Sequence, residues 1–126
     1  MTRATSPWRL DGLAPAEPAA DMLGRLEEIV RERHEARPEG SYTSYLFEKG
    51  IDKILKKVGE EATEVVIAAK NEENAALRSE VADLLFHLTV LLRARALPLS
   101  EVWEELEGRF GKASRIPGSG PVDRSS

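Results

Sequence analysis

The sequence predicts an all-α domain built on a helical hairpin. Two stretches, residues 51–70 and 75–94, repeat apolar side chains at steps of three and four, the spacing that places them on one face of a helix. The short connection 71–74 makes the second stretch return antiparallel to the first. No stretch alternates apolar and polar residues as half-buried β-strands do. We therefore expect an all-α fold of the four-helix bundle type.

Composition and charge narrow the class of protein. At 126 residues the chain is long enough for one domain with a hydrophobic core. Its net charge of −4 argues against non-specific nucleic-acid binding as the main role. The absence of cysteine excludes disulfides, thiolate zinc sites and cysteine nucleophiles. Because no apolar run could span a bilayer and no signal peptide is evident, we expect a cytoplasmic protein that does not bind membranes.

The two ends of the chain differ from its body. Residues 1–18 are rich in proline and small residues and are expected to form a flexible extension. Residues 113–126 are expected to form a flexible tail. Within the extension, Trp8 is interpreted as an isolated exposed aromatic residue, in preference to one that docks on the body. The domain itself then covers residues 19–112.

Helix-breaking residues divide this domain into four main helices. The first helix covers residues 19–36 and stops before Pro38 and Gly40. The hairpin supplies the second and third helices. Ser100 is the expected N-cap of the fourth helix, which follows the break at Pro98.

A short additional helix is expected near residues 45–48. The hydroxyl groups just before it, in Ser41, Thr43 and Ser44, suit either a helix cap or contact with a ligand phosphate, and the sequence leaves both open.

The third main helix has an unusually wide apolar face. It consists of Leu77, Val81, Leu84, Leu85, Leu88, Leu91 and Leu92. Because such a width indicates burial on more than one side, we expect the bundle to be completed by dimerisation.

Five carboxylates stand among the apolar residues of the hairpin. Residues three or four apart share a helix face, so Glu61 and Glu64 form one pair, with Glu60 beside them. Glu80 and Asp83 form the matching pair on the antiparallel helix. Like charges ~4 Å apart repel by about 4 kcal/mol at an effective dielectric near 20, so converging carboxylates need protons, lysines or a cation. Oxygen ligands alone favour Mg²⁺, or Mn²⁺, and such ions assist the cleavage of phosphate esters and phosphoanhydrides.

Basic residues accompany these acids. Lys53 and Lys57 lie within a narrow arc of the helix that also holds Glu60 and Glu64, and Lys56 is nearby. The simpler alternative is that Lys57 forms ordinary surface salt bridges with its neighbours, worth only about 0.3–0.5 kcal/mol each. The doubled acidic motif favours phosphate binding instead.

Two further residues of the hairpin allow alternative interpretations. His87 follows Asp83 by one turn and could contact it or a substrate, but a lone histidine among leucines is more often a satisfied core residue. We therefore leave His87 out of the catalytic set. Gly59, unfavourable in a helix interior by roughly 1 kcal/mol, either permits a close helix crossing or leaves room for a ligand.

The hairpin motif resembles that of a known family. Glu60-Glu61-x-x-Glu64, a gap of 15 residues and Glu80-x-x-Asp83 are similar to the signature of MazG-like all-α nucleoside triphosphate pyrophosphatases. More narrowly, the stretches SYTSYLFEKGIDKILKKVGEEATEVVIAAK and EVADLLFHLTVLL resemble the phosphoribosyl-ATP pyrophosphohydrolase family, which acts second in histidine biosynthesis. The resemblance covers residues 20–112, most of the chain.

This resemblance implies hydrolysis of the α–β phosphoanhydride of phosphoribosyl-ATP, with Mg²⁺, to phosphoribosyl-AMP and pyrophosphate. By position, the implied metal ligands are Glu61, Glu64, Glu80 and Asp83, and Glu60 assists as an outer ligand or by orienting the attacking water. The implied substrate-binding residues are Lys53, Lys56, Lys57, Ser41 and Thr43. Family members form dimers, and some carry a fused cyclohydrolase domain that we do not expect here.

Two rival functions stay open. One is a MazG-like house-cleaning pyrophosphatase for non-standard nucleotides, which only the stretch 41–50 could distinguish. The other, of a different class, is a non-catalytic helical dimerisation module whose acidic faces are simply solvated.

Overall fold

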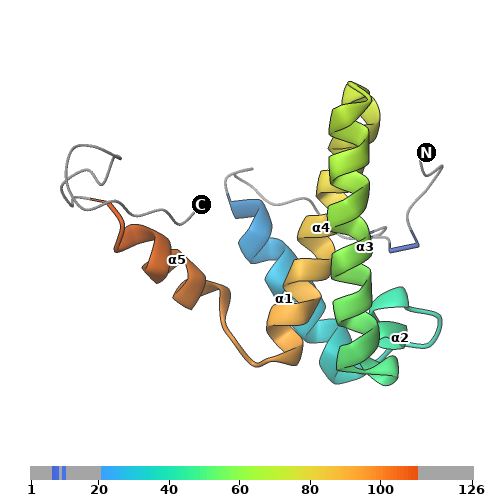
Figure 1. Ribbon diagram of the computed structural model, residues 1–126. Coiled ribbons are helices and arrows are strands. Elements are labelled where there is room, and N and C mark those ends of the chain that lie inside the picture. Colours follow the sequence, from blue (N-terminus) through green and yellow to red (C-terminus); the bar gives the residue numbers. More distant parts are fainter. Residues whose placement is uncertain (1–6, 9, 11–20, 111–126) are drawn as a thin grey trace.

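The computed structural model of the protein describes residues 7, 8, 10 and 21–110. This part of the chain forms five helices and contains no strand, which confirms the expected all-α fold (Figure 1). The helices are α1 (Met22–Ala36), α2 (Tyr42–Lys49), α3 (Ile51–Lys70), α4 (Asn74–Ala94) and α5 (Leu99–Glu107). None of these helices is both long enough and apolar enough to cross a bilayer. The expected C-terminal tail and most of the expected N-terminal extension lie outside the described residues.

Helices α3 and α4 form the antiparallel hairpin against which the rest of the bundle packs (Figure 1). The turn between them is tight because Glu72 adopts a left-handed backbone conformation with φ of 57°. The amide of Glu73 can then donate to the carbonyl of Ala68 at 3.2 Å, which satisfies one of the last carbonyls of α3. The predicted ends of α3 are confirmed, and α4 begins one residue earlier than predicted, at Asn74.

Helix α2 completes the packed body at the end of the hairpin opposite the turn (Figure 1). It contacts both α1 and α3 and is longer than the short helix expected near residues 45–48. The additional turn forms because the Ser41 hydroxyl caps the helix by accepting from the amide of Ser44 at 3.2 Å. The capping role considered for Ser41 is therefore confirmed.

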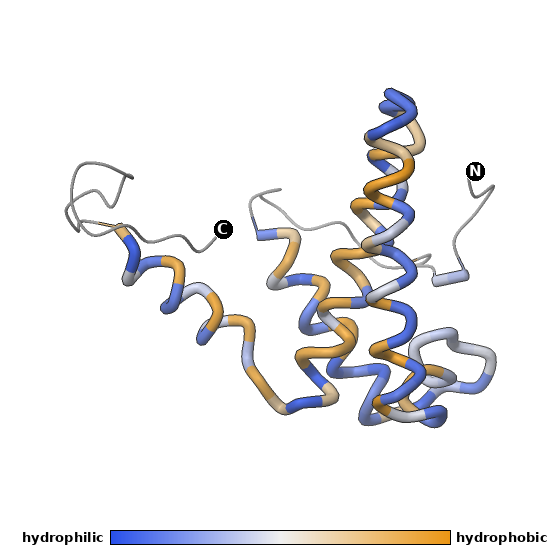
Figure 2. The backbone as a smooth tube through the Cα atoms, viewed as in Figure 1, coloured by the Kyte–Doolittle hydropathy of each residue, from blue (hydrophilic) through white to orange (hydrophobic). Residues whose placement is uncertain are grey.

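The core collects apolar side chains from four helices. Along each helix these positions alternate with hydrophilic ones (Figure 2). Each fully buried side chain of this kind contributes roughly 1.5–3 kcal/mol to folding. The buried cluster is Leu26, Val30, Leu46, Ile54, Phe86 and Val90.

Helix α5 stands apart from the packed body (Figure 1). The prediction that Ser100 caps it is wrong, since the helix begins at Leu99 with Pro98 in the N-cap position. Its first amide instead finds an acceptor on another helix, because the Leu99 N–H donates to Glu27 Oε2 of α1 at 2.8 Å. Leu99 is buried, whereas Trp103 farther along is exposed.

The interpretation of Trp8 as an isolated exposed residue is also wrong. Its indole stacks on Phe86, with ring centroids 4.6 Å apart and an interplanar angle of 4°. Leu10 packs against the same core. The helices leave apolar surface at Phe86 that a flat aromatic ring can cover, and such contacts between distant segments leave no periodic signal in a sequence.

His34 joins α1 to α4 as a hydrogen-bond acceptor. Arg93 Nε donates to His34 Nδ1 at 2.8 Å, and the imidazole stacks on Phe47 with centroids 4.1 Å apart. A ring nitrogen that accepts carries no proton, so this contact requires the neutral ring. Burial, followed by the charges of Arg93 and Arg37, lowers the pKa of His34 below 6.5, against the opposing effect of Glu35.

We expect NMR titration of the folded protein to give His34 a pKa below 6.5. Arg93→Gln should raise this pKa toward its ordinary value, because it removes both a nearby charge and the donor that requires a neutral ring. Arg95→Gln serves as the control, because it removes an exposed arginine two residues farther along the chain. It should leave the pKa of His34 unchanged.

The lowered pKa of His34 also makes the free energy of unfolding depend on pH. Between the folded pKa and 6.5 the unfolded chain binds a proton that folded His34 does not. This contribution to stability is therefore complete above pH 6.5 and is lost as the pH falls through the folded pKa. A His34 that titrates at or above 6.5 in the folded protein would contradict the assignment.

Candidate metal centre and active site

Three carboxylates meet inside the α3–α4 hairpin. Glu61 comes from α3, Glu80 and Asp83 come from α4, and one oxygen of each lies within 4.8 Å of the others. Glu61 is 0% exposed and the other two are 1% exposed. Because Glu80 and Asp83 are three residues apart, both lie on the face of α4 that packs against α3. The fold therefore brings three of the predicted metal-binding residues together.

The charge of this cluster calls for a positive partner. Three buried carboxylates carry a formal charge of −3, and the Nζ of Lys57 lies 3.7 Å from Glu61 Oε2. The lysine offsets part of this charge, and a divalent cation held by the three carboxylates would offset more of it. Carboxylate oxygens are the ligands that hard cations such as Mg²⁺ and Mn²⁺ prefer. The residues present therefore fit such an ion.

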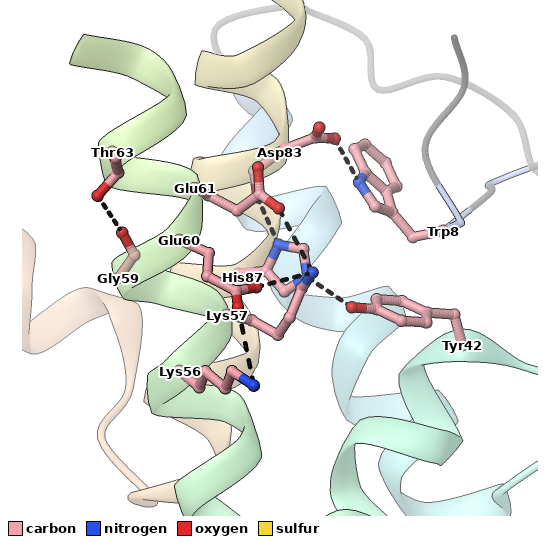
Figure 3. Close-up of polar contacts among 10 residues, drawn as sticks. All are labelled: Trp8, Tyr42, Lys56, Lys57, Gly59, Glu60, Glu61, Thr63, Asp83 and His87. Carbon is pink, nitrogen blue, oxygen red and sulfur yellow. Dashed lines mark hydrogen bonds and ion pairs between the residues drawn. The ribbon is translucent and has the colours of Figure 1, made fainter. Parts of the chain in front are cut away.

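Lys57 links the buried cluster to the surface of α3. Its side chain is 19% exposed, and its Nζ lies 3.4 Å from Oε1 of Glu60 as well as beside Glu61 (Figure 3). The side chain of Glu60 is 45% exposed, and its Oε2 lies 4.0 Å from Nζ of the exposed Lys56. Lys56, Glu60, Lys57 and Glu61 thus form a series of ion pairs of alternating charge. The series runs from the exposed surface to the buried carboxylates.

The other two predicted site residues of α3, Glu64 and Lys53, do not belong to this cluster. Glu64 is one turn beyond Glu61 and is partly buried, but the group of converging oxygens in the described part of the chain does not include it. Lys53, one turn before Lys57, lies with its Nζ 5.9 Å from the centre of the Tyr45 ring. This position places Lys53 toward α2.

The two predicted hydroxyl residues occupy different environments. Ser41 is partly exposed and lines an open cleft of about 420 Å³ at the start of α2, with Arg37 and Tyr45. Thr43 is 1% exposed and faces the interior. The Ser41 hydroxyl caps α2 and the Thr43 hydroxyl has no hydrogen-bond partner in the described residues, so neither hydroxyl is seen to bond to the carboxylate cluster.

Gly59 does not serve a close helix crossing. A Cβ placed there would meet no atom of another residue within 4 Å beyond its own helix turn, and the residue is exposed. Open space beside this turn of α3 is the alternative that agrees with the structure.

His87 is a satisfied core residue, as the sequence interpretation favoured. It is 0% exposed, its Nδ1 lies 2.8 Å from the carbonyl oxygen of Asp83, and its Nε2 lies 3.0 Å from the Tyr42 hydroxyl (Figure 3). A carbonyl only accepts, so Nδ1 carries the proton and the Tyr42 hydroxyl donates to Nε2. Burial lowers the pKa of His87, although the hydrogen bond to Asp83 and the charge of Glu61 act in the opposite direction. The neutral ring thereby ties α2 to the backbone of a cluster residue.

Trp8 is a residue of the site that the sequence reasoning missed. Its indole Nε1–H donates to Oδ1 of Asp83 at 2.9 Å (Figure 3). Nothing local in the sequence indicates this contact, which joins residues 75 positions apart.

The Tyr42–His87 hydrogen bond should contribute measurably to folding. Tyr42→Phe leaves a buried imidazole nitrogen without its donor, so we expect a loss of about 1–3 kcal/mol in the free energy of unfolding, measured with urea. Tyr45→Phe is the matched control, because that side chain is 39% exposed, and should change stability by less than about 0.5 kcal/mol. Equal losses in the two variants would contradict the assigned hydrogen bond.

Comparison with known proteins agrees with this geometry. The family model for phosphoribosyl-ATP pyrophosphohydrolase matches residues 23–110. A histidine biosynthesis bifunctional protein, HisIE, from Halalkalibacterium halodurans is 62% identical over 88 residues, which are 70% of this chain but 42% of that protein. This chain thus spans less than half of that bifunctional relative.

Shorter relatives are matched over most of their length. The phosphoribosyl-ATP pyrophosphatase of Listeria welshimeri is 60% identical over 93 residues, 74% of this chain and 89% of that protein. The corresponding protein of Listeria innocua is 57% identical over 94 residues, 75% of this chain and 90% of that protein. From the family match, which runs from the first turn of α1 to beyond the end of α5, this chain belongs to the phosphoribosyl-ATP pyrophosphohydrolase family.

Proposed function

We propose that this protein hydrolyses the α–β phosphoanhydride of 1-(5-phosphoribosyl)-ATP, giving phosphoribosyl-AMP and pyrophosphate in the second step of histidine biosynthesis. Membership of the family and the names of the Listeria relatives support the substrate and the reaction. The observation that carries the chemistry is the convergence of Glu61, Glu80 and Asp83 in the buried hairpin. Buried carboxylates of this kind lower the stability of the fold unless a positive charge, such as a bound cation, compensates them.

The cation we propose is Mg²⁺, with Mn²⁺ as a substitute. Glu61, Glu80 and Asp83 would hold it, and Glu64, one helical turn beyond Glu61, would complete the set of carboxylates. When bound, the ion would polarise phosphate oxygens and favour ionisation of a water molecule.

The other residues have roles set by their positions. Glu60, exposed beside the cluster and held by Lys57, would accept the proton of the attacking water. Lys57 would offset the charge that develops on the departing pyrophosphate, with Lys53 and Lys56 binding the outer phosphates. Ser41, at the start of α2, would contact the nucleotide, whereas Thr43 would support that turn from inside.

Glu80→Gln and Asp83→Asn test this function. Each removes one negative charge at nearly constant volume, so we expect pyrophosphate release from phosphoribosyl-ATP to fall by about 100-fold or more while the helical circular dichroism persists. Without metal, the variants should melt at the same temperature as the unsubstituted protein or higher, because one buried like charge is gone. Addition of Mg²⁺ should raise the melting temperature of the unsubstituted protein only.

Glu72→Gln, in the exposed turn between α3 and α4, is the control for loss of a carboxylate and should keep full activity. Normal turnover by both cluster variants would refute the assigned ligands. Faster pyrophosphate release from non-standard nucleoside triphosphates than from phosphoribosyl-ATP would favour the house-cleaning function instead. A protein with no hydrolytic activity and no thermal response to Mg²⁺ would be a helical dimerisation module.

We also propose that the active unit is a homodimer. Helices α3 and α4 leave several large apolar side chains more than a third exposed: Ile51, Leu55, Val66, Ile67, Val81 and Leu85. Two of them, Ile51 and Leu55, line an apolar cleft of about 600 Å³ together with Leu91 and Leu92. Large exposed apolar patches often mark protein–protein contacts, so these exposed side chains support a second copy as the covering surface.

Leu55→Glu tests the dimer. Leu55 is 48% exposed, so the substitution should leave the fold of each chain intact while placing a charge in the apolar interface. We expect sedimentation equilibrium to give a dimer dissociation constant at least about 10-fold higher than that of the unsubstituted protein. Met22→Glu, on α1 and 43% exposed, is the matched control. A monomeric unsubstituted protein would refute the proposed dimer.

A further inference from the structure

We propose that Trp8 is a positioning residue that fixes the carboxylate of Asp83 for cation binding. The inference rests on the metal site proposed above. The indole Nε1–H donates to Asp83 Oδ1 at 2.9 Å, from the side of the carboxylate facing away from α3 (Figure 3). An indole N–H is a donor only, so Trp8 cannot replace the carboxylate as a ligand or bind the cation itself.

The indole is held firmly enough to act in this way. Its ring stacks on Phe86 with centroids 4.6 Å apart and an interplanar angle of 4°. Phe86 is 0% exposed and belongs to the hydrophobic core, which also receives Leu10 from the same segment. Asp83 and Phe86 are three residues apart on α4, so the indole contacts two neighbouring side chains of one helix face.

A fixed carboxylate is a better ligand than a rotating one. A carboxylate has two oxygens with about four lone-pair positions, and the hydrogen bond to the indole uses one of them on Oδ1. That bond restricts rotation of the carboxylate plane and leaves acceptor positions for a cation. In protein metal sites generally, removal of such a hydrogen-bonding partner of a ligand weakens metal binding by roughly 10–100-fold.

The positioning group comes from outside the segment that defines the family. The family model matches residues 23–110, whereas Trp8 lies upstream of it. The N-terminal segment of this chain therefore adds a support for Asp83 to a site whose ligands lie within the family domain. Metal affinity in this protein should then depend on a residue that the shared helices do not supply.

Trp8→Phe in the full-length protein isolates the indole N–H. The phenyl ring can still stack on Phe86, so the apolar contact is kept while the donor is lost. We expect the dissociation constant for Mn²⁺, measured from the electron paramagnetic resonance of free Mn²⁺, to rise roughly 10-fold or more. Trp103→Phe, in which the exposed tryptophan of α5 is changed, is the matched control and should bind Mn²⁺ as the unsubstituted protein does.

A second measurement follows the hydrogen bond directly. In the Trp103→Phe variant the only indole N–H signal in a ¹⁵N–¹H spectrum belongs to Trp8. We expect this N–H to be protected from exchange with water and to stay protected when Mg²⁺ saturates the site. A merely structural role would predict a lower melting temperature for Trp8→Phe with no change in metal affinity.

The outcomes separate this inference from the proposed metal site. Equal Mn²⁺ affinities for Trp8→Phe and Trp103→Phe would overturn the positioning role and leave the metal site in place. Loss of protection at the Trp8 N–H on addition of Mg²⁺ would also overturn it, because the indole would then be displaced by the ion. Mn²⁺ binding that Glu80→Gln does not weaken would overturn the metal site and the positioning role together.

Discussion

The burial of three like charges between α3 and α4 is the constraint on which the rest of the structure depends. Glu61, Glu80 and Asp83 are as buried as the core residues Leu46 and Phe86, although ionised carboxylates in an apolar interior are costly. Helix α4 meets this constraint by alternating polar and core residues along one face, with Phe86 only three positions after Asp83. The packing that fixes the core therefore also fixes the carboxylates, and neither can shift without the other.

Support for the carboxylates comes from elements outside the hairpin. Helix α2 contributes the Tyr42 hydroxyl, which binds His87 and through it the backbone at Asp83. The N-terminal segment contributes the indole that binds the side chain of the same aspartate. One residue is thus held at its carbonyl and at its carboxylate by two separate parts of the chain. This double restraint agrees with a role in which the direction of a carboxylate matters.

The sequence was informative where structure follows from local periodicity. The ends of α3, the antiparallel hairpin and the convergence of Glu61 with Glu80 and Asp83 all follow from helical spacing and a short turn. It failed where a partner comes from a distant segment. Glu27 accepts the first hydrogen bond of α5 in place of the expected Ser100, and Trp8 docks on the core, because neither contact leaves a pattern between neighbouring residues. Glu64 shows a second limit of sequence-based prediction. Helical spacing puts it on the same face as Glu61, but spacing does not tell how far each side chain is buried.

The turn end of the hairpin extends beyond the helices that pack against it (Figure 1). There α3 and α4 support mainly each other, through small buried residues such as Ala68 and Ala76, whereas the opposite half is enclosed by α1 and α2. Local opening needs less free energy where fewer apolar contacts must separate. Amide hydrogens near the turn should therefore exchange through fraying, and those around Phe86 only through global unfolding. The carboxylates lie between these two regimes, at the boundary where a helix pair that can fray becomes a fixed core.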